Sequence, residues 1–367
     1  MKIFLINRDC IGGVKQYNLE LTKALKEINY DVVTVNYQLN DRKLLPEIKY
    51  TNSDIDCIIN EENLFLISKS KCIDFHEDDT LIFSEEIEYN LMYLLGFKGR
   101  LIYTLHGNTP HYYRTLNEMS RVLSGIITVN QKQIENIPNE ILHIPLICSP
   151  QINSIKQLEE SCTKSYELIF VGRINYAKGI DLFLELCSQI QGEKLIIASD
   201  QEIEEEYWTL INNAPNLKII FNLENHQVLK EISKSKFLIH PSRSEGFGIV
   251  LIEGIKNYSI PIVLEGSGGP EEILDEFNYL ILKESEFIPK AIDIYNKFTI
   301  SNSSLLIKAL QESINKKYSN HYLTKNFDLF IQNIINSEIK IFISNYKRKK
   351  YFLNFKNLLK ILWRKLV

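Results

Sequence analysis

Short apolar runs alternate with segments of helical period along most of the chain. In the N-terminal half, the runs expected to form buried strands are residues 2–6, 31–35, 56–59, 80–83, 101–105 and 126–129. Between the first two runs, apolar residues recur at the spacing of one helix face, at Val14, Tyr17, Leu21, Ala24, Leu25 and Ile28. Strands that alternate with helices predict βαβ units and a parallel sheet covered by helices.

The alternation stops at Pro145, after which polar residues and a second proline follow no clear period. We place an interdomain linker at residues 151–164. The pattern then resumes, with strands expected at residues 168–171, 194–198, 217–221, 236–240, 260–264 and 279–282. The chain therefore predicts two doubly wound α/β domains, residues 1–150 and 165–318, that face each other across a cleft. Helices at residues 319–346 are expected to follow and to pack back on the first domain.

Length, composition and charge agree with a two-domain protein. A chain of 367 residues exceeds the size at which one hydrophobic core usually stops growing. The net charge of −4 is uneven, because residues 347–367 carry eight Lys or Arg and no Asp or Glu, which leaves −12 for the rest. Such an acidic body argues against a general nucleic-acid binder.

The cysteines and the apolar segments indicate a cytoplasmic protein. The six cysteines are scattered and form no Cys-x2-Cys pair, which argues against a zinc site and against a disulfide framework. The apolar start of the chain is too short for a signal peptide and reads as a strand. No segment approaches the roughly 18 apolar residues that a membrane span needs.

The residues around Gly246 form the densest group of candidate functional positions. The strand expected at 236–240 leads into a turn that reads Ser-Glu-Gly-Phe-Gly, and a helix is expected to begin at Ile249. Gly246 and Gly248, with Phe247 between them, would let the backbone turn sharply and approach a ligand. The free amides at the start of such a helix favour a phosphate group.

Two glutamates belong to this segment. Glu245 lies in the turn, and Glu253 follows after seven intervening residues, in the second turn of the expected helix and among apolar neighbours. A buried carboxylate is costly without a partner, and the hydroxyls of a ribose would provide one. A plainer interpretation also fits, in which Glu245 only occupies a turn and Glu253 only favours the positive end of the helix.

The Ser-Glu-Gly-Phe-Gly turn and the spacing of Glu245 and Glu253 resemble the signature of the retaining glycosyltransferases of the large GT4-type family, the glycosyl transferases group 1. The resemblance implies the GT-B fold, an α/β fold of two facing Rossmann-like domains. It also implies transfer of a sugar from a UDP- or GDP-linked donor, bound by the second domain, to a hydroxyl acceptor on the side of the first domain.

Four further elements occur in the family's order, and together the matches extend from residue 1 to about residue 335. They are Gly12-Gly13, His106-Gly107, Gly172-Arg173 with Lys178-Gly179, and the loop 266–272. Each element also has a plain structural explanation. A tight turn accounts for paired glycines, solvated surface cations account for Arg173 and Lys178, and a histidine at a strand end is often structural.

The resemblance implies a set of site residues. Four would be catalytic: Glu245, Arg173, Lys178 and His106. The donor would be bound by Gly12, Gly13, Gly172, Arg173, Lys178, Glu245, Gly246, Phe247, Gly248, Ile249 and Glu253. In this set the two cations hold the diphosphate, Glu253 holds the ribose, and Glu245 and His106 lie beside the donor sugar.

No residue stands out as an enzymic nucleophile, and the resemblance suggests front-face attack in which the leaving phosphate takes the acceptor's proton. Catalysis would then depend on positioning and on charge stabilisation, without a cofactor or a metal ion. Asp54-Ile-Asp56 superficially resembles the metal motif of a different glycosyltransferase fold, but it lies at the start of an expected strand.

Three positions depart from the family pattern. Ala198-Ser199-Asp200 replaces a glycine-rich loop, Gly254 stands where alanine is usual, and Tyr279-Leu280 follows without the common Asp-Gly turn. These departures concern contacts to the base of the donor rather than the fold.

Two other classes of protein also fit. One is a non-catalytic GT-B-like partner of an active transferase, although such a scaffold would not need Glu245, Glu253, Arg173 and Lys178 together. The other is a GT-B epimerase or phosphorylase. A phosphorylase would bind inorganic phosphate in place of a nucleotide.

The segment 347–367 combines basic and apolar positions at helical spacing. Its apolar positions are Phe352, Phe355, Leu359, Leu362, Trp363 and Leu366, and Lys356, Lys360 and Arg364 form a basic stripe on another face. This pattern is typical of a helix that lies in an anionic membrane surface. A terminal helix packed on the protein, or an oligomer contact, also fits.

In the membrane interpretation the protein is peripheral on the inner face of the cell membrane, and the acceptor is a lipid-linked glycan in the synthesis of a surface polysaccharide such as lipopolysaccharide or capsule. The oligomeric state is left open.

Overall fold

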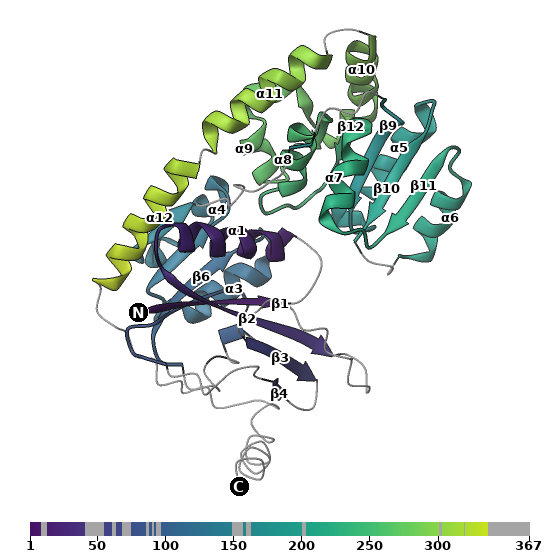
Figure 1. Ribbon diagram of the computed structural model, residues 1–367. Helices are drawn as coiled ribbons and strands as arrows, with labels where there is room; N and C mark the ends of the chain where they lie inside the picture. Colours follow the sequence, from purple (N-terminus) through teal and green to yellow (C-terminus); the bar gives the residue numbers. More distant parts are fainter. Residues whose placement is uncertain are drawn as a thin grey trace.

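The computed structural model describes residues 1–8, 13–40, 55–60, 64–67, 75–85, 88–89, 92, 97–148, 157–158, 163–199, 203–300, 303–318 and 320–336. It contains two sheets, each flanked by helices, in two α/β domains (Figure 1). The predicted fold class, two Rossmann-like α/β domains, is therefore confirmed. The limits 1–150, 151–164 and 165–318 stay predictions. The basic segment 347–367 lies outside the described residues.

The N-terminal sheet has eight strands in the order β4-β3-β2-β1-β5-β6-β7-β8. All neighbours are parallel except β3 and β4. The strands are β1 Lys2–Arg8, β2 Asp31–Asn40, β3 Ile55–Asn60, β4 Leu64–Ile67, β5 Thr80–Phe83, β6 Arg100–Leu105, β7 Gly125–Thr128 and β8 Leu146–Cys148. The apolar pattern located six of them and missed β4 and β8, which are short strands at the two edges.

Several helical segments follow the strands of this sheet. They are α1 Gly13–Glu27, α3 Pro110–Met119, α4 Gln131–Glu135 and the 3-10 helix η1 Asn139–Ile141. In α1 the predicted apolar face is the buried face, with Leu21 and Leu25 fully buried in the core.

The C-terminal sheet has six parallel strands in the order β11-β10-β9-β12-β13-β14. They are β9 Tyr166–Gly172, β10 Lys194–Ala198, β11 Leu217–Phe221, β12 Ser235–His240, β13 Ile260–Leu264 and β14 Ile281–Leu282. The strand order reverses between β9 and β12, and ligands of such sheets bind beyond the carboxyl ends of the strands at this point. The segment after β9 contains Arg173 and Lys178, and the segment after β12 contains Glu245.

Helices follow each strand of this sheet. They are η2 Tyr176–Lys178, α5 Ile180–Gln189, α6 Glu205–Asn213, α7 Asn225–Ser233, α8 Ile249–Lys256, α9 Gly269–Ile273, η3 Asp275–Leu280, η4 Glu284–Glu286, α10 Phe287–Ile300, α11 Ser303–Lys317 and α12 Asn320–Ile335. The helix predicted from Ile249 is α8, and Glu253 lies in its second turn, as expected.

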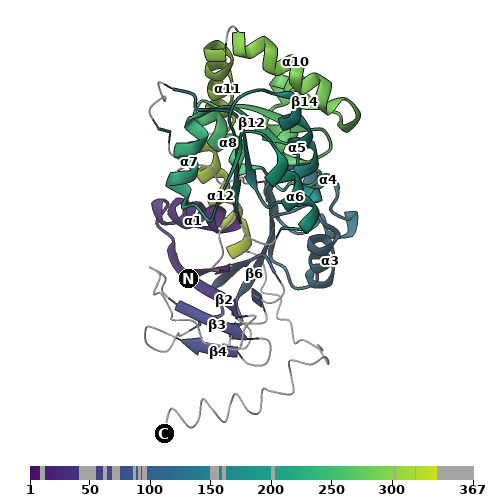
Figure 2. The same cartoon turned by 90° about the vertical axis from the view of Figure 1, so that its right-hand side faces the viewer.

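Helix α12 leaves the C-terminal domain and packs on the N-terminal one (Figures 1 and 2). The hydroxyl of Tyr30 donates to Asp328 Oδ1 at 2.8 Å, and Arg100 Nη2 donates to the carbonyl oxygen of Ile335 at 2.9 Å. At Gly125, the first residue of β7, a side chain would collide with Phe330 and Ile334. The last described helix is therefore part of the covering of the first sheet.

This packing predicts a specific loss of stability for Arg100→Met. Arg100 is 6% exposed, and besides Ile335 it donates to the carbonyl oxygen of Asp78 at 3.2 Å. Hydrogen bonds from a buried charged group contribute about 1.5–3 kcal/mol, so the free energy of unfolding should fall by about that amount. Urea titration followed by circular dichroism measures it. Lys98→Met, a change of an exposed cation nearby, is the control, and equal midpoints for the two variants would contradict this role of Arg100.

Candidate functional site

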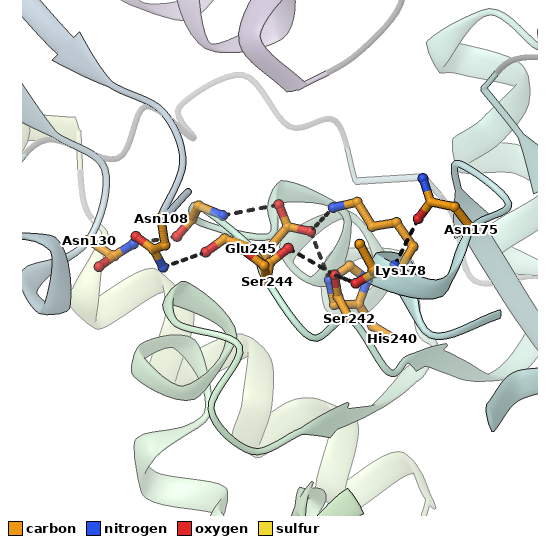
Figure 3. Close-up of polar contacts among 10 residues, drawn as sticks. Asn108, Asn130, Asn175, Lys178, His240, Ser242, Ser244 and Glu245 are labelled. Carbon is orange, nitrogen blue, oxygen red and sulfur yellow. Dashed lines mark hydrogen bonds and ion pairs between the residues drawn. The ribbon is translucent and has the colours of Figure 1, made fainter. Parts of the chain in front are cut away.

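The two domains meet where the carboxyl ends of their strands face each other. Asn108, after β6, donates Nδ2 to the carbonyl oxygen of Glu245 at 2.9 Å. Asn130, after β7, donates Nδ2 to the carbonyl oxygen of Gly246 (Figure 3). Gly246 packs so closely on the backbone of His106 that a β-carbon would run into its carbonyl oxygen. The Ser-Glu-Gly turn therefore lies at the junction between the domains.

The side chain of Glu245 is held by two basic groups. Its Oε2 lies 2.5 Å from Lys178 Nζ and 3.2 Å from His240 Nε2 (Figure 3). Its Oε1 accepts a hydrogen bond from the amide of Gly246 at 3.2 Å. Burial opposes ionisation of this carboxyl group, but the charge of Lys178 and the contact with His240 outweigh it and hold the pKa of Glu245 well below its ordinary value. Glu245 is therefore a carboxylate at any physiological pH.

Lys178 reaches Glu245 because a short 3-10 turn, η2, follows β9. Asn175 caps this turn, and its Oδ1 accepts from the amide of Lys178 at 3.0 Å. Gly179 ends the turn in a left-handed conformation (φ 71°), and a β-carbon there would collide with the carbonyl oxygen of Pro241. The glycine of the Lys-Gly pair thus allows η2 to lie directly against the segment that follows β12.

Arg243 also connects the segment after β12 to the segment after β9. Its Nη1 and Nη2 each lie 2.8 Å from an oxygen of Asp181, in a bidentate pair, and Nη2 also lies 2.6 Å from Glu284. Nη1 donates to the carbonyl oxygen of Tyr176 at 2.7 Å, and the guanidinium lies 3.7 Å from the centre of the Tyr176 ring. Arg243 was not among the predicted site residues, and its position two residues before Glu245 is the local feature that could have indicated it.

Arg173 is placed differently from Lys178. It follows β9 directly, is exposed, and makes no ion pair or side-chain hydrogen bond with the part of the chain that the structure describes. Lys178, in contrast, is already paired with Glu245. The structure therefore brings Glu245 and Lys178 together, whereas the guanidinium of Arg173, at the end of β9, has no partner among the residues that the structure describes.

Glu253 is a buried carboxyl group with one amide partner. It is 6% exposed, and its Oε1 accepts from Asn225 Nδ2 at 2.8 Å. Burial raises the pKa of Glu253 to about 7, although the hydrogen bond from Asn225 opposes the shift. The sequence indicated that this carboxylate needs a partner. It could not identify Asn225, which lies 28 residues earlier in the chain.

His106 is a neutral imidazole at the end of β6. Burial lowers its pKa to about 3, and its ring packs edge-on against Tyr17 with centres 4.8 Å apart. Its Nε2 is buried and has no hydrogen-bond partner among the described residues. A buried, unsatisfied ring nitrogen is costly unless a ligand or a water molecule meets it.

The other predicted binding residues contribute mainly backbone. Gly172 ends β9, Gly248 precedes α8 in a left-handed conformation (φ 85°), and Ile249 begins that helix. Phe247 is buried, and its ring packs edge-on against Tyr318 at 5.5 Å, so only its backbone could reach a ligand. Gly13 begins α1. Gly12 lies outside the described residues.

The described residues show neither a metal site nor a membrane-spanning helix. No group of three or more His, Cys, Asp or Glu side chains is placed to hold a metal ion. Among the helices that the structure describes, none has the length and apolar character needed to cross a membrane.

Comparisons with known proteins give matches to glycosyltransferases. Residues 151–294 match the family model of the glycosyl transferases group 1. The chain is 29% identical over 306 residues to the uncharacterized glycosyltransferase MJ1178 of Methanocaldococcus jannaschii, covering 75% of this chain and 81% of that protein. It is 30% identical over 137 residues to the amylovoran biosynthesis glycosyltransferase AmsD of Erwinia amylovora, covering 35% of this chain and 38% of AmsD.

A solved structure shares the fold. The pneumococcal O-GlcNAc transferase GtfA, in complex with UDP and GlcNAc, matches with a TM-score of 0.67 over 92% of this chain and 100% of that one. The sequences are 11% identical, so this likeness concerns the fold alone.

The raised pKa of Glu253 predicts how stability depends on pH. Because folding raises this pKa from 4.5 to about 7, the stabilisation linked to the bound proton is fully present below pH 4.5 and is lost as the pH rises through 7. Glu253→Gln cannot ionise and should not show this loss. Between pH 4.5 and 8 the wild type should lose about 3 kcal/mol of unfolding free energy relative to the variant.

Denaturant titrations at several pH values measure this difference. Glu118→Gln, at an exposed position on α3, is the control and should follow the wild type. If the curves of wild type and Glu253→Gln run parallel, Glu253 does not titrate in this range.

Proposed function

We propose that this chain, which matches the family model of the glycosyl transferases group 1 over residues 151–294 and has the GT-B fold, transfers a sugar from a UDP- or GDP-linked donor to a hydroxyl acceptor with retention of anomeric configuration. One observation carries the proposal. Glu245 and Lys178, 2.5 Å apart, lie beyond the carboxyl ends of β12 and β9, where the strand order reverses and the other domain begins.

The donor's diphosphate is proposed to bind between Arg173 and Lys178. Arg173 has no competing partner among the described residues, whereas Lys178 must share its charge between Glu245 and the phosphate. The amides at the start of α8, after Gly248, and at Gly13 add hydrogen-bond donors. Charge that develops on the leaving diphosphate would be stabilised by these groups, so we propose a reaction that needs no metal ion.

The remaining parts of the donor are assigned to Glu253, Glu245 and His106. Glu253 is buried and would accept hydrogen bonds from the ribose hydroxyls, which compensates for its desolvation. Glu245, fixed as a carboxylate by Lys178 and His240, would accept a hydrogen bond from the donor sugar. The unsatisfied Nε2 of His106 would meet a sugar hydroxyl from the other domain.

Glu245 is the carboxylate proposed to lie nearest the donor sugar, and both of its oxygens already contact other groups of the protein. It is therefore not free to act as a nucleophile. We therefore propose front-face attack, in which the acceptor oxygen forms its bond to the anomeric carbon as the bond to the phosphate breaks. The leaving phosphate oxygen takes the acceptor's proton. The protein's contribution is then orientation of the two substrates and stabilisation of the leaving charge.

The acceptor is proposed to be a lipid-linked glycan in the synthesis of a surface polysaccharide. Two features support this choice: the similarity to AmsD, which is named for amylovoran biosynthesis, and the basic, apolar pattern of residues 347–367. We place the enzyme on the inner face of the cell membrane, attached through that segment.

The first test of this proposal is nucleotide binding, followed by transfer. In a thermal-shift panel of UDP, GDP, ADP, TDP and CMP, one diphosphate at ~100 times its dissociation constant should stabilise the protein by about 2.7 kcal/mol. With the corresponding donor, Arg173→Ala and Lys178→Gln should each lower turnover by at least about 100-fold. Each substitution removes one positive charge of the protein that is oriented toward the leaving diphosphate.

Arg121→Ala is the matched control, since this exposed arginine follows α3 and lies before the amino end of β7, away from the carboxyl ends of the strands. EDTA should leave the rate unchanged. Strong inhibition by EDTA that magnesium or manganese reverses would refute the metal-independent mechanism. Binding of inorganic phosphate in place of every nucleotide would indicate a phosphorylase.

The second test concerns membrane attachment. Removal of the residues after Asn345 should abolish sedimentation with anionic liposomes and leave nucleotide binding intact. Each of the eight basic residues near an anionic surface contributes about 1 kcal/mol, so attachment of the full chain should weaken as salt is added. Equal sedimentation of the two proteins would show that the segment is not the anchor.

A further inference from the structure

We propose that Asn108 and Asn130 are positioning residues that set the geometry of Glu245 only when the two domains are closed. Both belong to the N-terminal domain, and they donate to two successive carbonyl groups of the opposite domain, those of Glu245 and Gly246. The proposal rests on the assignment of Glu245 to the donor sugar made above.

The orientation of Asn130 is fixed by a helix cap. Its Oδ1 accepts from the amide of Gln133 at 2.9 Å, and Gln133 Oε1 in turn accepts from the amides of Val129 and Asn130. Asn130 is fully buried. Because the cap engages the oxygen of this amide, its NH2 group must face the other way, toward the carbonyl oxygen of Gly246. The cap at the start of α4 therefore also determines an interdomain hydrogen bond.

Asn108 holds the preceding carbonyl group of the same turn. Its Nδ2 donates to the carbonyl oxygen of Glu245, while the amide of Glu245 donates to the carbonyl oxygen of Ser267 at 2.9 Å. The backbone of Glu245 is thus fixed on one side by its own domain and on the other side by the opposite domain.

Steric constraints make this contact specific. A β-carbon at Gly268 would collide with Asn108 Nδ2, and one at Gly246 would collide with the carbonyl oxygen of His106. Both positions must therefore be glycine for the two asparagines to reach the turn. Separation of the domains would break both hydrogen bonds together and leave the turn held by its own domain, through the amide of Glu245 on Ser267 and the amide of Gly269 on the carbonyl oxygen of Gly246 at 3.2 Å.

Replacements that remove the interdomain donor and change little else test the idea. Asn108→Asp, at a half-buried position, exchanges the NH2 group for an acceptor of the same shape. At position 130 the same exchange would bury a carboxylate, so Asn130→Ser is used, which keeps a cap residue at α4. Asn136→Asp is the matched control, because Asn136 is exposed at the other end of α4 and hydrogen-bonds within its own domain.

The first measurement is small-angle X-ray scattering of the ligand-free proteins. We expect a larger radius of gyration for Asn108→Asp and Asn130→Ser than for the wild type and Asn136→Asp. Equal radii of gyration for all four proteins would overturn the proposal. This result does not depend on which donor the enzyme uses.

The second measurement separates positioning from folding. With UDP-glucose, UDP-N-acetylglucosamine or GDP-mannose, whichever the wild type uses, turnover should fall by about tenfold in each variant, equivalent to about 1.4 kcal/mol in the transition state. The dissociation constant of UDP or GDP should change by much less than turnover, because the proposed nucleotide contacts, apart from the amide of Gly13, lie in the C-terminal domain. The double variant should lose less than the product of the two single effects, since both asparagines hold one turn.

The outcomes distinguish the two hypotheses. If turnover stays at the wild-type level while nucleotide binding and transfer occur, the asparagines do not position Glu245, and the proposed function stands. If the wild type binds neither UDP nor GDP, the proposed function fails, and scattering alone decides whether the asparagines hold the domains closed.

Discussion

The site depends on one carboxylate that is kept ionised in a place where burial would favour its neutral form. Glu245 stays charged because Lys178 and His240 both reach the same oxygen. Each of these partners comes from the carboxyl end of a different strand, β9 or β12, on the two sides of the point where the strand order reverses. The sheet topology thus creates the electrostatic environment, since no local sequence could bring a lysine to a glutamate 67 residues away.

The positions of the main elements followed from the sequence. Parallel strands buried on both faces are short, continuous apolar runs, and the runs at β1, β6, β9 and β12 were located to within one or two residues. Strand β8 was missed because it has only three residues and directly follows a proline, inside a stretch without a period. Strand β4 was missed because four residues at an antiparallel edge give too little pattern to recognise.

The sequence predicted the motifs of the site, but not the hydrogen bonds that hold them in place. The turn from Glu245 to Gly248, the helix that begins at Ile249 and the Lys-Gly pair were all visible as motifs, because glycines and unusual charges mark them locally. Asn108, Asn130 and Asn225 carried no such mark. Each acts through a hydrogen bond to a residue 28 to 137 positions away, and an asparagine at a strand or helix end is ordinary in itself.

The course of α12 has a consequence for how the protein can be divided. This helix follows the C-terminal sheet in sequence, yet Phe330 and Ile334 are buried against β7 of the N-terminal sheet. A fragment cut at the linker would therefore expose apolar surface on both halves: the first would lack part of its covering, and the second would carry an unprotected helix. The N-terminal folding unit is therefore discontinuous in sequence, so an N-terminal fragment that folds alone must include α12, supplied covalently or as a separate peptide.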